Sequence, residues 1–121
     1  MTDVVLVLTT VASPREAEPI AATLLGERLA ACVNVVGPCR SVYRWQGAVE
    51  RADEVILLIK TTRGRYEALQ ERLRGIHPYA LPEILALSPE AVLPAYARWV
   101  AGETDPSPSS SRSHSAADSE K

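Results

Sequence analysis

Apolar runs with strand-like and helix-like spacing alternate along the first hundred residues. Residues 4–8 form a continuous and mostly β-branched apolar run, which is typical of a central strand buried on both faces. A helix is predicted to begin after Ser13, with Pro14 at its first position and Glu16 completing a capping box. Its buried stripe would consist of four apolar residues at helical spacing, namely Ile20, Leu24, Leu25 and Leu29.

The middle of the chain predicts a long β-hairpin. Residues 31–45 have the pattern of a long strand, and Gly37-Pro38 interrupts it as a bulge, which places this strand at a sheet edge. Gln46-Gly47 forms the turn, and residues 49–62 form the partner strand. A second helix is expected to follow, with Thr62 as its N-cap.

The chain continues with a strand over residues 82–87 and a short helix over residues 92–100. The resulting order, β-α-β-β-α-β plus a helix, predicts an α+β fold of the ferredoxin-like type. In such a sandwich, two helices cover one face of a four-stranded sheet. The domain is predicted to span residues 1–102. Residues 103–121 contain seven serines and no large apolar side chain, so we expect a disordered tail there.

The predicted hairpin strands are too long for the domain that carries them. A strand of about 14 residues spans roughly 46 Å, whereas a domain of about 100 residues has a diameter near 34 Å. The overhang would expose unpaired backbone groups, and it carries Tyr43, Arg44 and Trp45, residue types favoured at interfaces. We therefore expect the hairpin to pair with another copy of the chain. The alternative is a sharp bend at Gly37-Pro38 that folds the hairpin back on itself.

Composition and charge exclude several classes of function. Residues 1–102 carry 11 basic and 11 acidic side chains, and a neutral body without a basic stripe argues against a nucleic-acid partner. No apolar run approaches the roughly 20 residues of a membrane helix. The first residues lack the pattern of a signal peptide, so we expect a cytoplasmic protein without a membrane partner. Cys32 and Cys39 are then expected to be reduced strand residues.

Four short segments in fixed order carry a family resemblance, and they occupy residues 27–36, 41–47, 57–62 and 77–84. Together they resemble the CutA family of divalent-cation tolerance proteins, and the resemblance covers roughly residues 4–101. It implies a homotrimer, a role in the response to metal ions, and weak binding of copper or another divalent cation. Copper binding in that family relies on a cysteine at the end of the first strand and on histidines just before Pro-Tyr.

Only part of that copper-binding set is present in this chain. The first predicted strand ends with Thr9 and Thr10 instead of a cysteine, and Ile76 precedes the one matching histidine, His77. His77 is therefore the candidate metal ligand that the resemblance implies. The alternative is a polar loop residue that closes the second helix before Pro78.

A second candidate site lies where the long strand passes into the second helix. Lys60, Thr62 and Arg63 combine two cations with a hydroxyl at a helix start, where a phosphate or carboxylate could bind. The alternative there is an N-cap followed by a solvated basic turn. CutA resembles the PII-type signalling proteins in its subunit fold and trimeric build, so a small-molecule-sensing trimer is an alternative function. A stable trimeric scaffold for a partner protein is another.

Catalysis has no support in the sequence. The predicted domain contains one histidine, and no nucleophile motif accompanies it. We therefore do not predict an enzyme.

Overall fold

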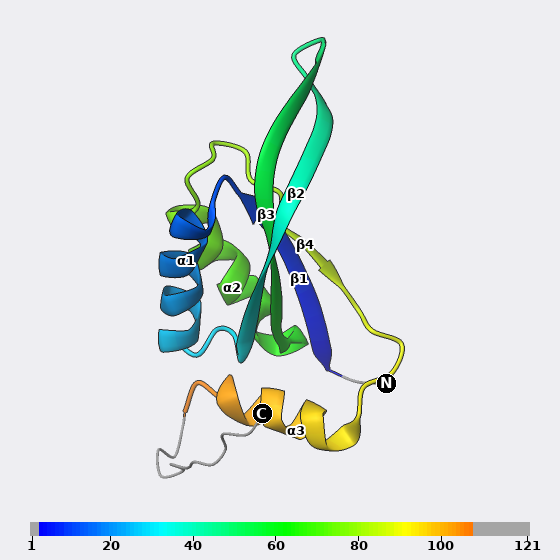
Figure 1. Ribbon diagram of the computed structural model, residues 1–121. Coiled ribbons are helices and arrows are strands. Elements are labelled where there is room, and N and C mark those ends of the chain that lie inside the picture. The colour runs from blue at the N-terminus through cyan, green and yellow to red at the C-terminus, as the bar shows by residue number, and fades with distance from the viewer. Residues whose placement is uncertain (1–2, 108–121) are drawn as a thin grey trace.

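The computed structural model describes residues 3–107. Its elements are β1 (Val4–Val11), α1 (Pro14–Gly26), β2 (Cys32–Trp45), β3 (Ala48–Thr62), α2 (Arg63–Ile76), β4 (Leu85–Leu87) and α3 (Pro94–Glu103). The four strands form one sheet in the order β2-β3-β1-β4, and all neighbours are antiparallel. Helices α1 and α2 lie on the same face of this sheet (Figure 1). The predicted ferredoxin-like α+β fold is confirmed, including the additional C-terminal helix.

The hydrophobic core lies between the sheet and helices α1 and α2. Every second residue of β1 and β3 faces these helices, and the directly paired Val7 and Ile59 are both fully buried. The helices contribute leucines such as Leu24 and Leu69, which are also fully buried. Burying one such side chain stabilises the fold by about 1.5–3 kcal/mol. The aliphatic core therefore holds both helices against a single face of the sheet.

The predicted stripe of the first helix is partly wrong. Ile20 and Leu24 are buried as expected, but Leu25 points outward and is 42% exposed. Leu29 is buried, yet it lies beyond the last helical residue, Gly26. A buried stripe about 100° wide includes residues i and i+4, here Ile20 and Leu24. The next residue, Leu25, lies only at the margin of that stripe.

The starts of the two long helices differ from their predicted caps. At α1, the Ser13 hydroxyl accepts a hydrogen bond from the Glu16 backbone N–H at 3.3 Å. The Glu16 carboxylate accepts from the Ala12 N–H at 3.3 Å, so the expected reciprocal bond to Ser13 is replaced by one to its neighbour. Thr62 occupies the N-cap of α2 without a side-chain capping bond. The Arg63 N–H instead donates to the Asp3 carbonyl at 2.7 Å, which ties the start of α2 to the residue before β1.

The hairpin of β2 and β3 extends well beyond the two-layer body, as Figure 1 shows. The register shifts between Val36 and Cys39, which confirms the predicted bulge on an edge strand. A Cβ atom at Gly37 would lie 2.8 Å from the Val55 Cγ1 atom, so glycine permits the close approach of β2 to the core at this point. The alternative in which the hairpin folds back on itself is wrong.

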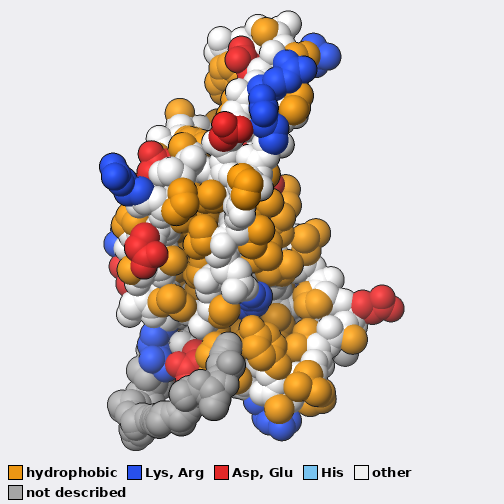
Figure 2. Space-filling model, viewed as in Figure 1, with side chains coloured by type: hydrophobic (Ala, Val, Ile, Leu, Met, Phe, Trp, Pro, Cys, Tyr) orange, Lys and Arg blue, Asp and Glu red, His pale blue; other side chains and the backbone are white. Residues whose placement is uncertain are grey.

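The face of the sheet opposite α1 and α2 is apolar and largely uncovered. Directly paired residues share a face, and Leu8 pairs with both Leu58 and Leu85. We call this surface the open face and define it by Leu6, Leu8, Val36, Ile56, Leu58, Leu85 and Leu87. Figure 2 shows hydrophobic side chains gathered over the sheet. Leu6, Leu8 and Thr10 of β1 lie on this side and are only half-buried, so β1 is central but is not buried on both faces as predicted.

The last two elements are shifted from their predicted bounds. The strand β4 includes only Leu85–Leu87 of the predicted residues 82–87, and Pro82 has no N–H with which to pair. Helix α3 begins and ends later than predicted, because Pro94 opens it and the Thr104 hydroxyl donates to the Val100 carbonyl at 2.8 Å. The Arg28 side chain donates to the Gly102 and Asp105 carbonyls at the end of this helix.

The fold therefore continues past the predicted boundary at residue 102. Thr104 is almost fully buried. The remainder of the predicted tail, residues 108–121, lies outside the described residues. Within residues 3–107, no helix combines the length and apolar character required to cross a membrane.

Candidate functional site

His77 lies at the junction between α2 and β1, and both of its ring nitrogens are engaged. Its backbone N–H donates to the Leu73 carbonyl at 2.9 Å, so it is the C-cap of α2. The Nδ1 atom accepts a hydrogen bond from the Tyr79 N–H at 3.1 Å. The Nε2 atom lies 3.0 Å from both the Thr9 hydroxyl and the Thr10 carbonyl. Because Nδ1 accepts, the proton of a neutral ring resides on Nε2 and is donated toward Thr10.

The surroundings of His77 favour its neutral form. The side chain is 8% exposed, and burial lowers the pKa of His77 below its ordinary value of 6.5. The hydrogen bond to the Thr10 carbonyl and the charges of Glu16 and Glu54 oppose this effect without reversing it. A neutral imidazole is the form that binds metal ions. Here, however, its one lone pair already accepts the Tyr79 N–H.

A network of hydroxyl groups around Glu54 lies next to His77. The two Glu54 carboxylate oxygens accept hydrogen bonds from the Ser41 hydroxyl at 2.5 Å and from the Tyr79 hydroxyl at 2.6 Å. The Tyr79 and His77 rings are in contact, with centroids 4.9 Å apart. Burial and then the Glu54 carboxylate raise the pKa of the Tyr79 phenol. The network therefore joins the base of the hairpin to the loop after α2.

Sequence reasoning did not connect these three residues. Tyr79 belongs to one of the segments that carry the family resemblance, whereas Glu54 lies outside all four of them. The contact between Ser41 and Glu54 depends on the strand register beyond the bulge. There, Cys39 is directly opposite Glu54 and Ser41 is directly opposite Ala52, so Ser41 and Glu54 are diagonal neighbours. Counting residues along the hairpin without the bulge gives a different diagonal neighbour.

A pH titration of stability should report the burial of neutral His77. Its folded-state pKa is below the unfolded value, so its stabilising contribution is complete above about pH 6.5 and is lost as the pH falls through the folded-state pKa. We expect the free energy of unfolding to fall as the pH drops below about 6.5, with a shallower fall in His77→Asn. Urea unfolding of both proteins across this range measures the difference. Identical pH dependence in the two proteins would contradict the assignment.

The predicted anion-site residues do not converge on one point. The Lys60 ammonium donates to the Asn34 side chain on the open-face side of the sheet and lies 3.9 Å from the Cys32 Sγ atom. Arg63 instead donates to the Ser88 hydroxyl, after β4, at 3.1 Å. Thr62 lines a cavity between the sheet and α3 that includes neither Lys60 nor Arg63. Anion binding at these residues stays a prediction.

The two cysteines are separated along β2, and each has a different neighbour. Cys32 pairs with Lys60 near the start of the strand, whereas Cys39 pairs with Glu54 beyond the bulge. Both are free thiols. Within residues 3–107, no group of three or more histidine, cysteine or acidic side chains could hold a metal ion.

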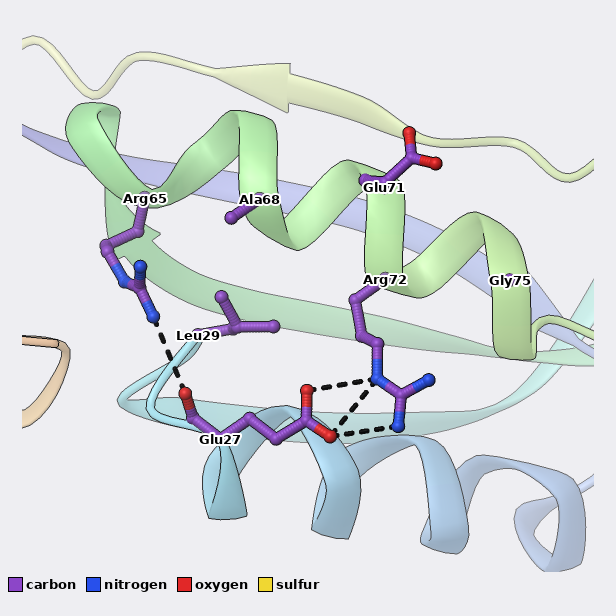
Figure 3. A pocket seen from close by; sticks show the side chains of 7 residues that line it. All are labelled: Glu27, Leu29, Arg65, Ala68, Glu71, Arg72 and Gly75. Atoms are coloured by element: carbon purple, nitrogen blue, oxygen red, sulfur yellow. Dashed lines mark hydrogen bonds and ion pairs between the residues drawn. The ribbon is translucent and has the colours of Figure 1, made fainter.

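A surface groove between the end of α1 and α2 contains an internal ion pair (Figure 3). The Arg72 guanidinium bonds to both carboxylate oxygens of Glu27, with distances of 2.9–3.1 Å. The Arg65 guanidinium donates to the backbone carbonyls of Glu27 and Arg28. Hydrogen bonding and the charge of Glu27 raise the pKa of Arg72. These cations therefore fix the turn after α1, which suits a structural role.

Comparison with known protein families decides the classification. The family model described as CutA1 divalent ion tolerance protein matches residues 5–103. The chain belongs to this family. The match covers every element from β1 to α3, so the family resemblance found in the sequence is confirmed.

Individual CutA relatives agree in sequence and in fold. The divalent-cation tolerance protein CutA of Thermus thermophilus is 51% identical over 82 residues, which cover 68% of this chain and 80% of that protein. The crystal structure of CutA from Xylella fastidiosa superposes with a TM-score of 0.83 at 42% identity, covering 86% of this chain and 100% of that one. A Xenopus laevis CutA homologue is 43% identical over 69% of this chain, but the match spans only 56% of that longer protein.

Proposed function

We propose that this chain acts in tolerance to divalent cations as a homotrimer that binds copper, or another divalent cation, weakly through His77. The match to the CutA1 family over residues 5–103 carries the role in divalent-cation tolerance. The choice of copper as the metal and of His77 as its ligand rests on the resemblance of the segment that contains His77 to the CutA family. The geometry around His77 supports the weakness of the binding.

Weak binding follows from the hydrogen bonds that an ion must displace. In the neutral ring, one nitrogen holds the proton directed at Thr10 and the other accepts the Tyr79 N–H. A metal ion at either nitrogen requires one of these contacts to open, and each is worth about 0.5–1.5 kcal/mol. The other groups beside the ring that could bind a metal ion are the Thr9 hydroxyl oxygen and the Thr10 carbonyl oxygen, which are hard ligands. Such a set suits a low-affinity site.

Self-association is supported by two surfaces of the subunit. The open face exposes large apolar side chains, including Leu85 at 46% and Leu87 at 49%. The projecting hairpin carries Tyr43 and Trp45, both nearly half exposed, together with Arg44. Contiguous exposed apolar surface of this kind marks protein interfaces. The strands β2 and β4 are the outer strands of the sheet, so within residues 3–107 each has one edge without a strand partner, to which a second copy could pair. The proposal of three subunits rests on the family resemblance.

Native mass spectrometry with low-micromolar Cu(II) tests the proposal. The wild-type protein should appear as a trimer that retains copper, and His77→Asn should bind at least about tenfold more weakly, because even outer-shell changes cost 10–100-fold. His114→Asn is the matched control, since it removes the only other histidine of the chain. A bare wild-type trimer, or equal retention by wild type and His77→Asn, would remove copper binding at His77. A monomer would remove the assembly.

A further inference from the structure

A cleft between the base of the hairpin and the loop after α2 has the lining of a cation-binding site. Its volume is about 690 Å³. This lies in the range of roughly 300–1,000 Å³ that is typical of small-molecule sites. The strands β1, β2 and β3 and the loop after α2 contribute to its walls. Both charged side chains that line it, Glu54 and Glu83, are acidic.

Aromatic rings form one part of the wall. Tyr43 and Trp45 project from β2 on the same side as Ser41, and in the single subunit both residues are nearly half exposed. Tyr79 contributes a third ring from the loop after α2. The face of an aromatic ring attracts a cation and also packs against an alkyl chain. The wall therefore suits a ligand that carries both a positive charge and an apolar body.

The two carboxylates supply charge that is not neutralised within the cleft. The hydroxyl groups of Ser41 and Tyr79 fix the Glu54 carboxylate, and these two bonds use only part of its acceptor capacity of about four. The Glu83 side chain is exposed and makes no hydrogen bond or ion pair within residues 3–107. The first carboxylate is thus preorganised, and the second can turn toward a ligand.

We propose that this cleft binds a small organic cation, an ammonium or guanidinium group carried on a short alkyl chain. The cationic group donates hydrogen bonds to Glu54 and Glu83. The alkyl chain packs against the rings of Tyr43 and Trp45. The binding of an organic cation here does not depend on metal binding at His77, and it goes beyond the proposed role in divalent-cation tolerance. It assigns the aromatic residues of the hairpin base to a ligand site in addition to subunit contact.

Agmatine, which has a guanidinium and an ammonium on a short chain, is a suitable probe. In a Trp99→Phe background, Trp45 is the sole tryptophan and lines the cleft, so its fluorescence reports binding directly. Agmatine should give a saturable change in that fluorescence. Glu54→Gln and Glu83→Gln should each weaken binding by about tenfold, the usual effect of losing a hydrogen bond to a charged group. Glu67→Gln, the same charge change on the exposed surface of α2, should leave it unaltered.

Two further comparisons make the test specific. Neutral 1,5-pentanediol and anionic glutarate share the alkyl chain without the positive charge, and neither should bind detectably. Circular dichroism checks the fold of Glu54→Gln. Glu83 has no hydrogen-bond or ion-pair partner among residues 3–107, so its variant decides the matter even if Glu54→Gln unfolds. The absence of saturable agmatine binding, equal binding of the diol, or an unaffected Glu83→Gln variant would overturn the proposal. Copper binding measured on the same protein separates this outcome from failure of the metal role.

Discussion

Leu57→Ala is expected to lower the free energy of unfolding by about 2–5 kcal/mol, the usual effect of truncating a buried leucine. Leu57 is fully buried at the centre of β3, where it pairs with Thr9 of β1 and Val35 of β2. The truncation removes apolar contacts and leaves a cavity that a close-packed core fills only partly. Because a domain is typically stable by about 5–15 kcal/mol, this change alone removes a large share of the total.

Denaturant unfolding monitored by circular dichroism measures this loss. Leu81→Ala is the matched control, because Leu81 is 72% exposed and the same truncation there should change stability by no more than about 0.5 kcal/mol. Both proteins should be compared at one concentration, since association also contributes to apparent stability. Equal losses for the two variants would show that Leu57 does not lie in the core.

Leu58→Asp should have a different and equally large effect, on assembly. Leu58 is the neighbour of Leu57 on β3, but it faces the opposite side of the sheet and belongs to the open face. A carboxylate at a buried subunit contact is left without a partner, which costs several kcal/mol. We expect the dissociation constant of the proposed oligomer to rise by at least about a hundredfold, which corresponds to roughly 2.7 kcal/mol.

Light scattering coupled to size-exclusion chromatography measures the mass of the variant. Leu25→Asp introduces the same charge at an exposed leucine of α1, on the helical side of the subunit, and should leave the mass unchanged. A Leu58→Asp protein that keeps the wild-type mass while remaining folded would show that the open face is not the contact surface. Helical circular dichroism of the variant distinguishes dissociation from unfolding.

The adjacent positions of Leu57 and Leu58 illustrate how much of the fold local pattern encodes. Both belong to one apolar run, and the sequence predicts that this run lies inside a sheet. Strand geometry then sends consecutive side chains to opposite faces. The sequence does not say which face the helices cover, because a continuous apolar run lacks the alternation that marks a solvated side. Packing of α1 and α2 decides that Leu57 is in the core and that Leu58 is on the open face.

The candidate site shows the same division. The position of His77 at the end of α2, before Pro78, is readable from the sequence, because proline ends a helix and the segment resembles a known family. Its partners Thr9 and Thr10 lie 67–68 residues earlier in the chain. Only the packing of β1 against the end of α2 brings them to the ring. Contacts over such separations carry no periodic signal.

The sequence by itself determined the order of elements, the length of the hairpin and the bulge at Gly37-Pro38, because spacing, turn residues and proline act locally on the backbone. The tertiary structure decided what surrounds each polar group. It neutralised His77 by burial, fixed Glu54 between Ser41 and Tyr79, and separated Lys60 from Arg63. Burial and hydrogen bonding depend on which distant segments meet, and that is set by the packing of the whole domain.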